Sequence, residues 1–133
     1  MTEFGEIARD AAAGLAGRDA LAALAHALRG YVTAHPGRYA ATVGAEFTGQ
    51  DDPLLTAGTR VIELIGAVLR GYRIGEDTIV HAIRAVRCTL HGWATLQAVS
   101  GFQWSGDLDV SFEALIDFMD TGLRGLAGDR RPG

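Results

Sequence analysis

The sequence has no lysine, a single cysteine and no strand-length stretch that alternates between apolar and polar residues. All 12 basic side chains are arginine, and 16 acidic side chains give a net charge of −4. Without a basic excess, we do not expect these residues to bind a nucleic-acid backbone. The single Cys88 excludes a disulfide within the chain and favours a reducing, cytoplasmic environment. The missing alternation predicts no β-sheet.

A signal peptide is also missing, because residues 1–10 contain no basic region followed by an apolar run. Charged residues are absent from Cys88 to Gly106. This interval has the length of a membrane span, but its histidine, glutamine, threonine and serine side chains argue against a lipid environment. We therefore expect no contact with membranes.

Apolar residues instead recur with the spacing of α-helices along most of the chain. We expect an all-α bundle of five or six helices in one domain over residues 1–128, followed by a frayed tail at 129–133. The helix starts are predicted from capping residues, which are Asp19, Asp52 before Pro53, Asp77 or Thr78, and Asp109. The predicted helices cover residues 2–16, 19–35, 53–74, 77–101 and 109–127, with a shorter helical segment between 38 and 47.

The uncharged part of the predicted helix 77–101 has no side that suits water. A helix that is apolar or weakly polar all round is buried all round, and the remaining helices are too few to surround it. We therefore expect one side to pack on the chain's own core and another on a second copy of the chain. Small residues would let a partner helix approach closely, at Gly92, Ala94, Ala98 and Gly101. The alternative is a central core helix of a monomer.

Catalytic and metal-binding patterns are weak. Cys88 and His91 lie one helical turn apart, but no third metal ligand accompanies them. Cys88 also lacks an oxyanion site, so we expect a buried structural thiol rather than a nucleophile. Helical spacing places Glu113, Asp117 and Asp120 on the solvated face of the last helix. We therefore predict no enzyme activity, no metal and no cofactor.

Aromatic and polar side chains from several helices are the remaining indication of a site. If they converge, they would line a pocket for a small molecule, although each of them also suits ordinary core packing. The predicted ligand-binding residues are Tyr31, His35, Tyr39, Phe47, Leu69, Tyr72, Arg87 and His91.

Three segments resemble a known family. They are YVTAHPGRYAA (31–41), LHGWATLQ (90–97) and SFEALIDFMDTGL (111–123). Their order is similar to that of the C-terminal domain of TetR-type bacterial transcriptional regulators, in the subgroup called WHG. One departure is that Arg87 and Cys88 stand where a tryptophan is expected before the His91-Gly92 pair.

The resemblance implies a homodimer whose last two long helices form a four-helix bundle with those of the partner. The predicted interface residues are Gly92, Ala94, Ala98, Gly101, Phe112, Ile116, Met119 and Leu123. The resemblance also implies a pocket for a small apolar or aromatic effector, and binding of operator DNA through an N-terminal helix-turn-helix that this sequence does not contain. We therefore expect the ligand-sensing and dimerisation domain of a repressor. The alternatives are a free-standing helical dimer that binds small molecules or proteins, and a small enzyme that uses Cys88 or His91.

Overall fold

The computed structural model describes residues 14–35, 53–99, 101–102 and 106–128, and within the second range it describes side chains from residue 62 onward. This part of the chain contains four α-helices and no strand: α2 (Gly17–Ala34), α4 (Pro53–Arg70), α5 (Glu76–Ala98) and α6 (Leu108–Gly128). The all-α prediction is confirmed. The helices predicted at residues 2–16 and 38–47, and the tail at 129–133, lie outside the described residues.

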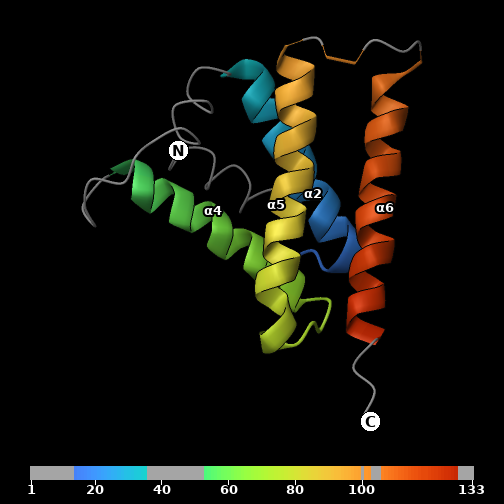
Figure 1. Cartoon of the computed structure of the whole chain (residues 1–133). Coiled ribbons are helices and arrows are strands. Elements are labelled where there is room, and N and C mark those ends of the chain that lie inside the picture. The colour runs from blue at the N-terminus through green and yellow to red at the C-terminus, as the bar shows by residue number, and fades with distance from the viewer. Residues whose placement is uncertain (1–13, 36–52, 100, 103–105, 129–133) are drawn as a thin grey trace.

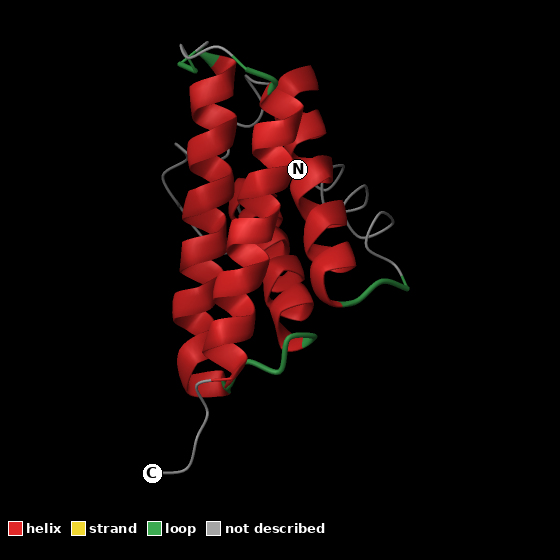
Figure 2. Cartoon of the chain, turned by 90° about the vertical axis from the view of Figure 1, so that its right-hand side faces the viewer, coloured by secondary structure: helices red, strands yellow, loops and turns green. Residues whose placement is uncertain are grey.

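The two longest helices run antiparallel and lie side by side in front of α2 (Figures 1 and 2). Helix α2 packs against both α5 and α6, whereas α4 crosses at an angle and packs mainly on α5. No helix of the described part is both long and apolar enough to cross a membrane.

The helix ends differ from the predicted ones by a few residues. Helix α2 begins at Gly17, which places Asp19 in the first turn rather than at the N-cap. Helix α6 begins at Leu108 because the carboxylate of Asp107, not that of Asp109, accepts a hydrogen bond from the Asp109 backbone N–H at 2.8 Å. Two further starts can be compared with the prediction: α4 begins at Pro53 as predicted, and α5 begins at Glu76, one residue before Asp77.

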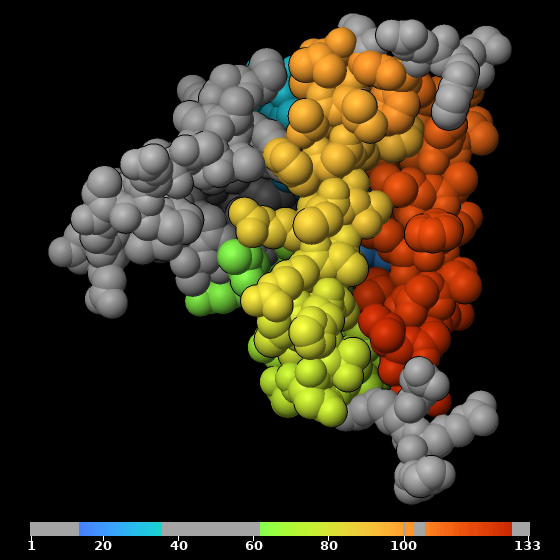
Figure 3. Space-filling view, in the orientation of Figure 1, coloured from blue at the N-terminus to red at the C-terminus, as the bar shows by residue number. Residues whose placement is uncertain are grey.

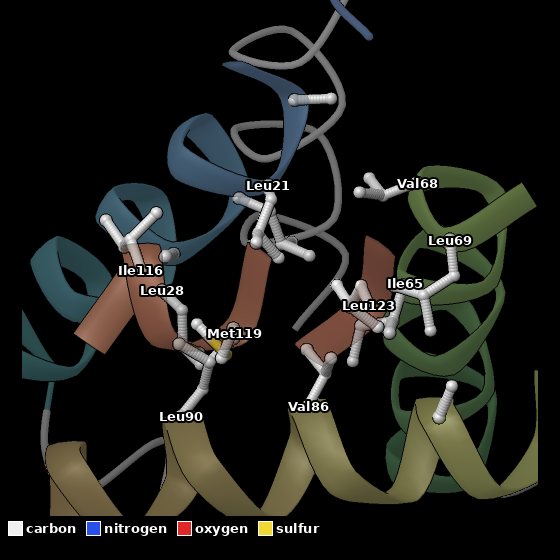
Figure 4. Packing of buried hydrophobic residues seen from close by; sticks show 14 of the residues in the cluster. Leu21, Leu28, Ile65, Val68, Leu69, Val86, Leu90, Ile116, Met119 and Leu123 are labelled. Carbon is white, nitrogen blue, oxygen red and sulfur yellow. The ribbon is translucent and has the colours of Figure 1, made fainter. Parts of the chain in front are cut away.

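The hydrophobic core lies where α2, α4, α5 and α6 meet (Figure 4). Each helix contributes one stripe, and the largest fully buried side chains are Leu21, Leu24, Leu69, Phe112 and Ile116. Burying a side chain of this size stabilises the fold by roughly 1.5–3 kcal/mol. The apolar periodicity of α2, α4 and α6 therefore predicted correctly most of the described side chains that these helices bury.

Candidate functional site

A mostly buried arginine organises the end of the core near the loop between α5 and α6. The side chain of Arg29, on α2, is only 15% exposed. Its guanidinium carbon lies 5.6 Å from the ring centroid of Trp93 on α5 and 4.8 Å from that of Phe112 on α6. These distances are typical of cation–π contacts, which are stronger when the cation is shielded from water. Arg29 therefore joins all three helices.

Hydrogen bonds complete this group of residues, which we call the Arg29 cluster: Arg29, Trp93, Gln97, Asp109 and Phe112. The side-chain oxygen of Gln97 accepts hydrogen bonds from Nε of Arg29 at 3.0 Å and from Nε1 of Trp93 at 2.8 Å. Trp93 and Gln97 lie four residues apart on α5, so they share one face of the helix. Nη1 of Arg29 donates to the exposed carboxylate of Asp109 at 2.8 Å.

A cavity of about 230 Å³ lies beside this cluster, between α2 and α5. We call it the α2–α5 cavity. Its lining combines three polar side chains with three apolar ones: Arg29, Thr33 and Gln97 with Val32, Ala94 and Ala98. A mostly apolar wall with a few polar groups is the usual composition of a small-molecule site.

The second feature is an apolar surface that the chain leaves uncovered on α5 and α6. On α5 it consists of Cys88, Gly92, Thr95, Leu96 and Val99, on the side opposite the buried Val86 and Leu90. Leu96 is 46% exposed and Val99 is 71% exposed. The uncharged part of α5 therefore has one side buried in the core of its own chain and one side exposed to solvent.

Helix α6 has a matching exposed stripe, at Val110, Ala114, Phe118, Thr121 and Gly122. Val110 is 66% exposed and Phe118 is 78% exposed, although both are large apolar side chains. Nothing lies within 4 Å of the Cβ position of Gly122, so the surface beside it is open. Because α5 and α6 lie side by side (Figure 3), we refer to these two stripes together as the outer face.

The structure corrects half of the predicted interface. Phe112, Ile116, Met119 and Leu123 are at most 6% exposed within the single chain, because α2 and α5 already cover them. Side chains buried in this way have no surface left for a partner. The prediction chose the apolar stripe of α6 that fills the core, and the exposed stripe lies on the opposite side of the helix.

The other four predicted interface residues occupy different places. Ala94 is buried at 4% exposure and, with the exposed Ala98, lines the α2–α5 cavity rather than the outer face. Gly92 lies in the exposed stripe of α5 with open space around its Cβ position. Gly101 is exposed and follows the end of α5, and its Cβ position is only 3.0 Å from Leu96 Cδ2. Their role in dimerisation stays a prediction.

The six described residues of the predicted ligand-binding set lie in different parts of the structure. Tyr31 and His35 are neighbours at the end of α2, with ring centroids 5.1 Å apart. Leu69 and Tyr72 belong to the core, whereas Arg87 is exposed and His91 is half-buried on α5. The six described residues of the set are all absent from the lining of the α2–α5 cavity. Tyr39 and Phe47 lie outside the described residues.

The described residues that line the cavity were not among the predicted ligand-binding residues. Arg29 directly follows Leu28 and precedes Val32 by three positions, so it borders the buried stripe of α2. Gln97 follows Trp93 at the spacing that places both on one helix face. A charged or amide side chain that borders an apolar stripe was therefore the sequence signal for these cavity residues. The predicted ligand-binding residues were instead chosen mainly for their aromatic rings.

Two further predictions for polar residues were wrong. Cys88 is exposed on α5, not a buried thiol. Asp120 is only 8% exposed, because its carboxylate accepts a hydrogen bond of 2.6 Å from the hydroxyl of Tyr72. Arg124, one turn later, forms an ion pair with Asp120 at 3.1 Å. Burial of Tyr72 and its bond to the carboxylate both raise the pKa of the phenol.

The predicted solvated face of α6 is confirmed for its other two carboxylates, which form ion pairs with α2. Arg18 donates to Asp117 at 2.7 Å and to Glu113 at 3.1 Å. The ring of His26 approaches Glu113 at 2.7 Å. The hydrogen bond with His26, and then the bond from Arg18, lower the pKa of Glu113.

Comparison with known proteins identifies the family to which this arrangement belongs. Residues 21–119 match the family described as tetracyclin repressor-like, C-terminal domain. The chain is also 33% identical over 112 residues to an HTH-type transcriptional regulator of Mycobacterium tuberculosis. The match covers 84% of this chain and 50% of that relative, so the chain spans about half the relative's length. The chain belongs to the TetR-type family of transcriptional regulators and corresponds to the C-terminal domain, as the resemblance predicted.

Proposed function

We propose that this chain is the dimerisation and ligand-sensing domain of a TetR-type repressor, and that the outer face joins two copies of it. The observation that carries this proposal is the exposure of the outer face, on which Leu96, Val99, Val110 and Phe118 are each at least 46% exposed. Large apolar side chains exposed together on a small protein usually mark an interaction site. A two-fold axis through this surface would pack α5 and α6 against the same helices of the partner.

The α2–α5 cavity supports the ligand-sensing part of the proposal. Its wall is formed partly by Ala94 and Ala98, and the residue that caps the end of α5, Val99, belongs to the outer face. A ligand in the cavity therefore contacts the helix that meets the partner. If it binds two arrangements of the dimer unequally, it shifts their populations by that difference in affinity.

The consequence for DNA follows from geometry. A dimeric regulator contacts two half-sites about 34 Å apart, so its DNA-binding heads must keep that separation. A ligand that favours a different arrangement of α5 and α6 in the dimer would change the separation and release the DNA. In this proposal the effector is a small apolar or aromatic molecule, and the DNA-binding head is an N-terminal helix-turn-helix in the longer protein.

Light scattering of residues 1–133 tests the proposal. The expected mass is that of a dimer at micromolar concentration, and a monomer would contradict it. A thermal-shift screen of small aromatic compounds tests the second part, because a ligand that binds the folded state raises the melting temperature. A dimer that no such compound stabilises would limit the function to dimerisation.

A further inference from the structure

We infer that the α2–α5 cavity takes a small organic anion, whose carboxylate binds Arg29 in place of Asp109. This inference rests on the proposed function and specifies the chemistry of its ligand. The observations that carry it are the position of Arg29 in the cavity wall and the way in which its present carboxylate partner is held.

The described part of the cavity wall carries a positive charge. Among the described lining residues, Arg29 is the only charged one, and none is an aspartate or glutamate. A guanidinium carries five N–H donors in a planar fork, and the hydrogen bonds to Gln97 and Asp109 use two of its nitrogens, Nε and Nη1. Trp93 and Phe112 hold its plane by cation–π contacts, so the donors are in place before a ligand arrives.

Gln97 supplies a second donor to an anion. Its side-chain oxygen already accepts hydrogen bonds from both Arg29 and Trp93, which fixes the orientation of the amide. The amide nitrogen, a donor of two hydrogen bonds, is therefore on the other branch of the side chain. Arg29 and Gln97 together offer N–H groups to a carboxylate, while the apolar Val32, Ala94 and Ala98 suit a short hydrocarbon or an aromatic ring.

The size of the cavity limits the ligand. Its volume of about 230 Å³ is below the ~300–1,000 Å³ of sites for drug-sized ligands. A single aromatic ring or a short alkyl chain with one carboxylate is of the right size. Nucleotides are too large, and polyanions need more cations than the described lining provides.

Asp109 now binds the Arg29 donor, Nη1, that the ligand's carboxylate would take. It accepts a hydrogen bond from Arg29 at 2.8 Å, yet its own side chain is 82% exposed. An ion pair with one partner in water contributes little to stability, so a ligand can displace it at small cost. Asp109 lies in the first turn of α6, the helix that carries Phe118. Exchange of the carboxylates would therefore release the start of α6 when the ligand binds.

Two variants with opposite expected effects test this inference in residues 1–133. The probes are benzoate and hexanoate, with benzamide as the neutral counterpart of benzoate, and the measurement is calorimetric titration. Asp109→Asn removes the competing charge, so both carboxylates should bind several-fold more tightly. Arg29→Gln removes the cation and should weaken their binding by at least about tenfold, as expected for the loss of a charge-assisted hydrogen bond. Benzamide should bind weakly to all forms.

The matched control is Asp77→Asn, which makes the same change of charge at an exposed position in the first turn of α5. It should leave the affinity for benzoate unchanged. Circular dichroism shows whether Arg29→Gln folds, and if it does not, the tighter binding to Asp109→Asn still decides the question. Failure of both carboxylates to bind, equal affinity for benzoate and benzamide, or unchanged affinity in Asp109→Asn would each overturn the inference. In those cases a dimer stabilised by neutral compounds would leave the proposed function intact, whereas a monomer would contradict it.

Discussion

The two faces of α6 are both apolar, but one is buried within the chain and the other is exposed to solvent. Phe112, Ile116, Met119 and Leu123 form a stripe that the rest of the chain covers almost completely. Val110, Ala114, Phe118 and Gly122 form a second stripe that the chain leaves open. Ile116 is 0% exposed and Phe118 is 78% exposed, although they are only two positions apart.

This difference shows what an apolar stripe does and does not determine. Apolar side chains are removed from water because burial is favourable, whichever surface covers them. The burying surface for the first stripe comes from α2 and α5 of the same chain. In our proposal the burying surface for the second stripe comes from another copy. Substitutions on the two faces should therefore affect different equilibria, folding for one and association for the other.

The largest expected effect is on the covered face. Ile116→Ala should lower the free energy of unfolding by about 2–5 kcal/mol, because it removes buried methyl groups and leaves a cavity. Urea unfolding followed by circular dichroism measures this change. The control is Ile62→Ala, on an α4 residue that is 38% exposed, which should cost much less. Equal losses in the two variants would mean that the covered stripe of α6 is not part of the folding core.

The next largest effect is expected for a substitution on the outer face. Phe118→Glu should weaken dimerisation by at least about 30-fold, which corresponds to the ~2 kcal/mol expected for an aromatic residue at the centre of an interface. The helix content should stay the same, because the side chain makes no contribution to the core. Light scattering over a dilution series measures the change in association.

Ile62→Glu is the matched control, because it places the same charge on an exposed apolar position of α4. It should remain a dimer. If Phe118→Glu stays dimeric at the same concentrations, the partner covers some other surface. If both variants dissociate, the effect comes from added negative charge rather than from the outer face.

The sequence predicted the helices well because their main signal is local. Apolar spacing in α2, α4 and α6 follows from 3.6 residues per turn, and most of the described residues of each predicted stripe are buried. The N-caps were less accurate because Asp107 and Asp109 both have the right chemistry. Only the turn geometry before Leu108 determines which of the two carboxylates accepts the backbone hydrogen bond.

The site was much harder to predict, because it depends on contacts between helices. Arg29 resembles any arginine of a solvated face until Trp93, Gln97 and Phe112 are placed around it by packing. Likewise, the residue type of Asp120 predicts an exposed carboxylate. Asp120 is buried because it lies next to Met119 in the covered stripe and binds Tyr72, which lies in the turn after α4. A sequence gives the periodicity of one helix, and it does not give the neighbours of that helix.

A third, smaller effect tests the polar group on the covered face. Tyr72→Phe should lower the free energy of unfolding by about 1–3 kcal/mol, because it leaves the buried carboxylate of Asp120 without its hydrogen-bond donor. Asp120→Ala removes the acceptor, so each of the two substitutions alone eliminates the hydrogen bond. A double-mutant cycle with these two substitutions, measured by urea unfolding, gives the coupling energy. A coupling near zero would show that the bond does not stabilise the fold.

The smallest effect is expected where α6 meets α2 at the surface. The pKa of Glu113 is below its ordinary value of 4.5 in the folded state, because the ionised carboxylate is stabilised first by the hydrogen bond with His26 and then by Arg18. A carboxylate of this kind contributes stability at a pH above its unfolded-state pKa, and the contribution disappears as the pH falls through the lower folded-state pKa. Glu113→Gln should therefore reduce the loss of melting temperature on acidification below about pH 4.5, relative to the unsubstituted protein. Because these groups are half-exposed, solvent screens the interaction and the change should be smaller than that of Tyr72→Phe.

Glu63→Gln, at an exposed position of α4, is the control and should leave the acid-induced loss of melting temperature unchanged. If the two variants respond alike to acid, the contacts of α6 with Arg18 and His26 do not contribute to its docking on α2.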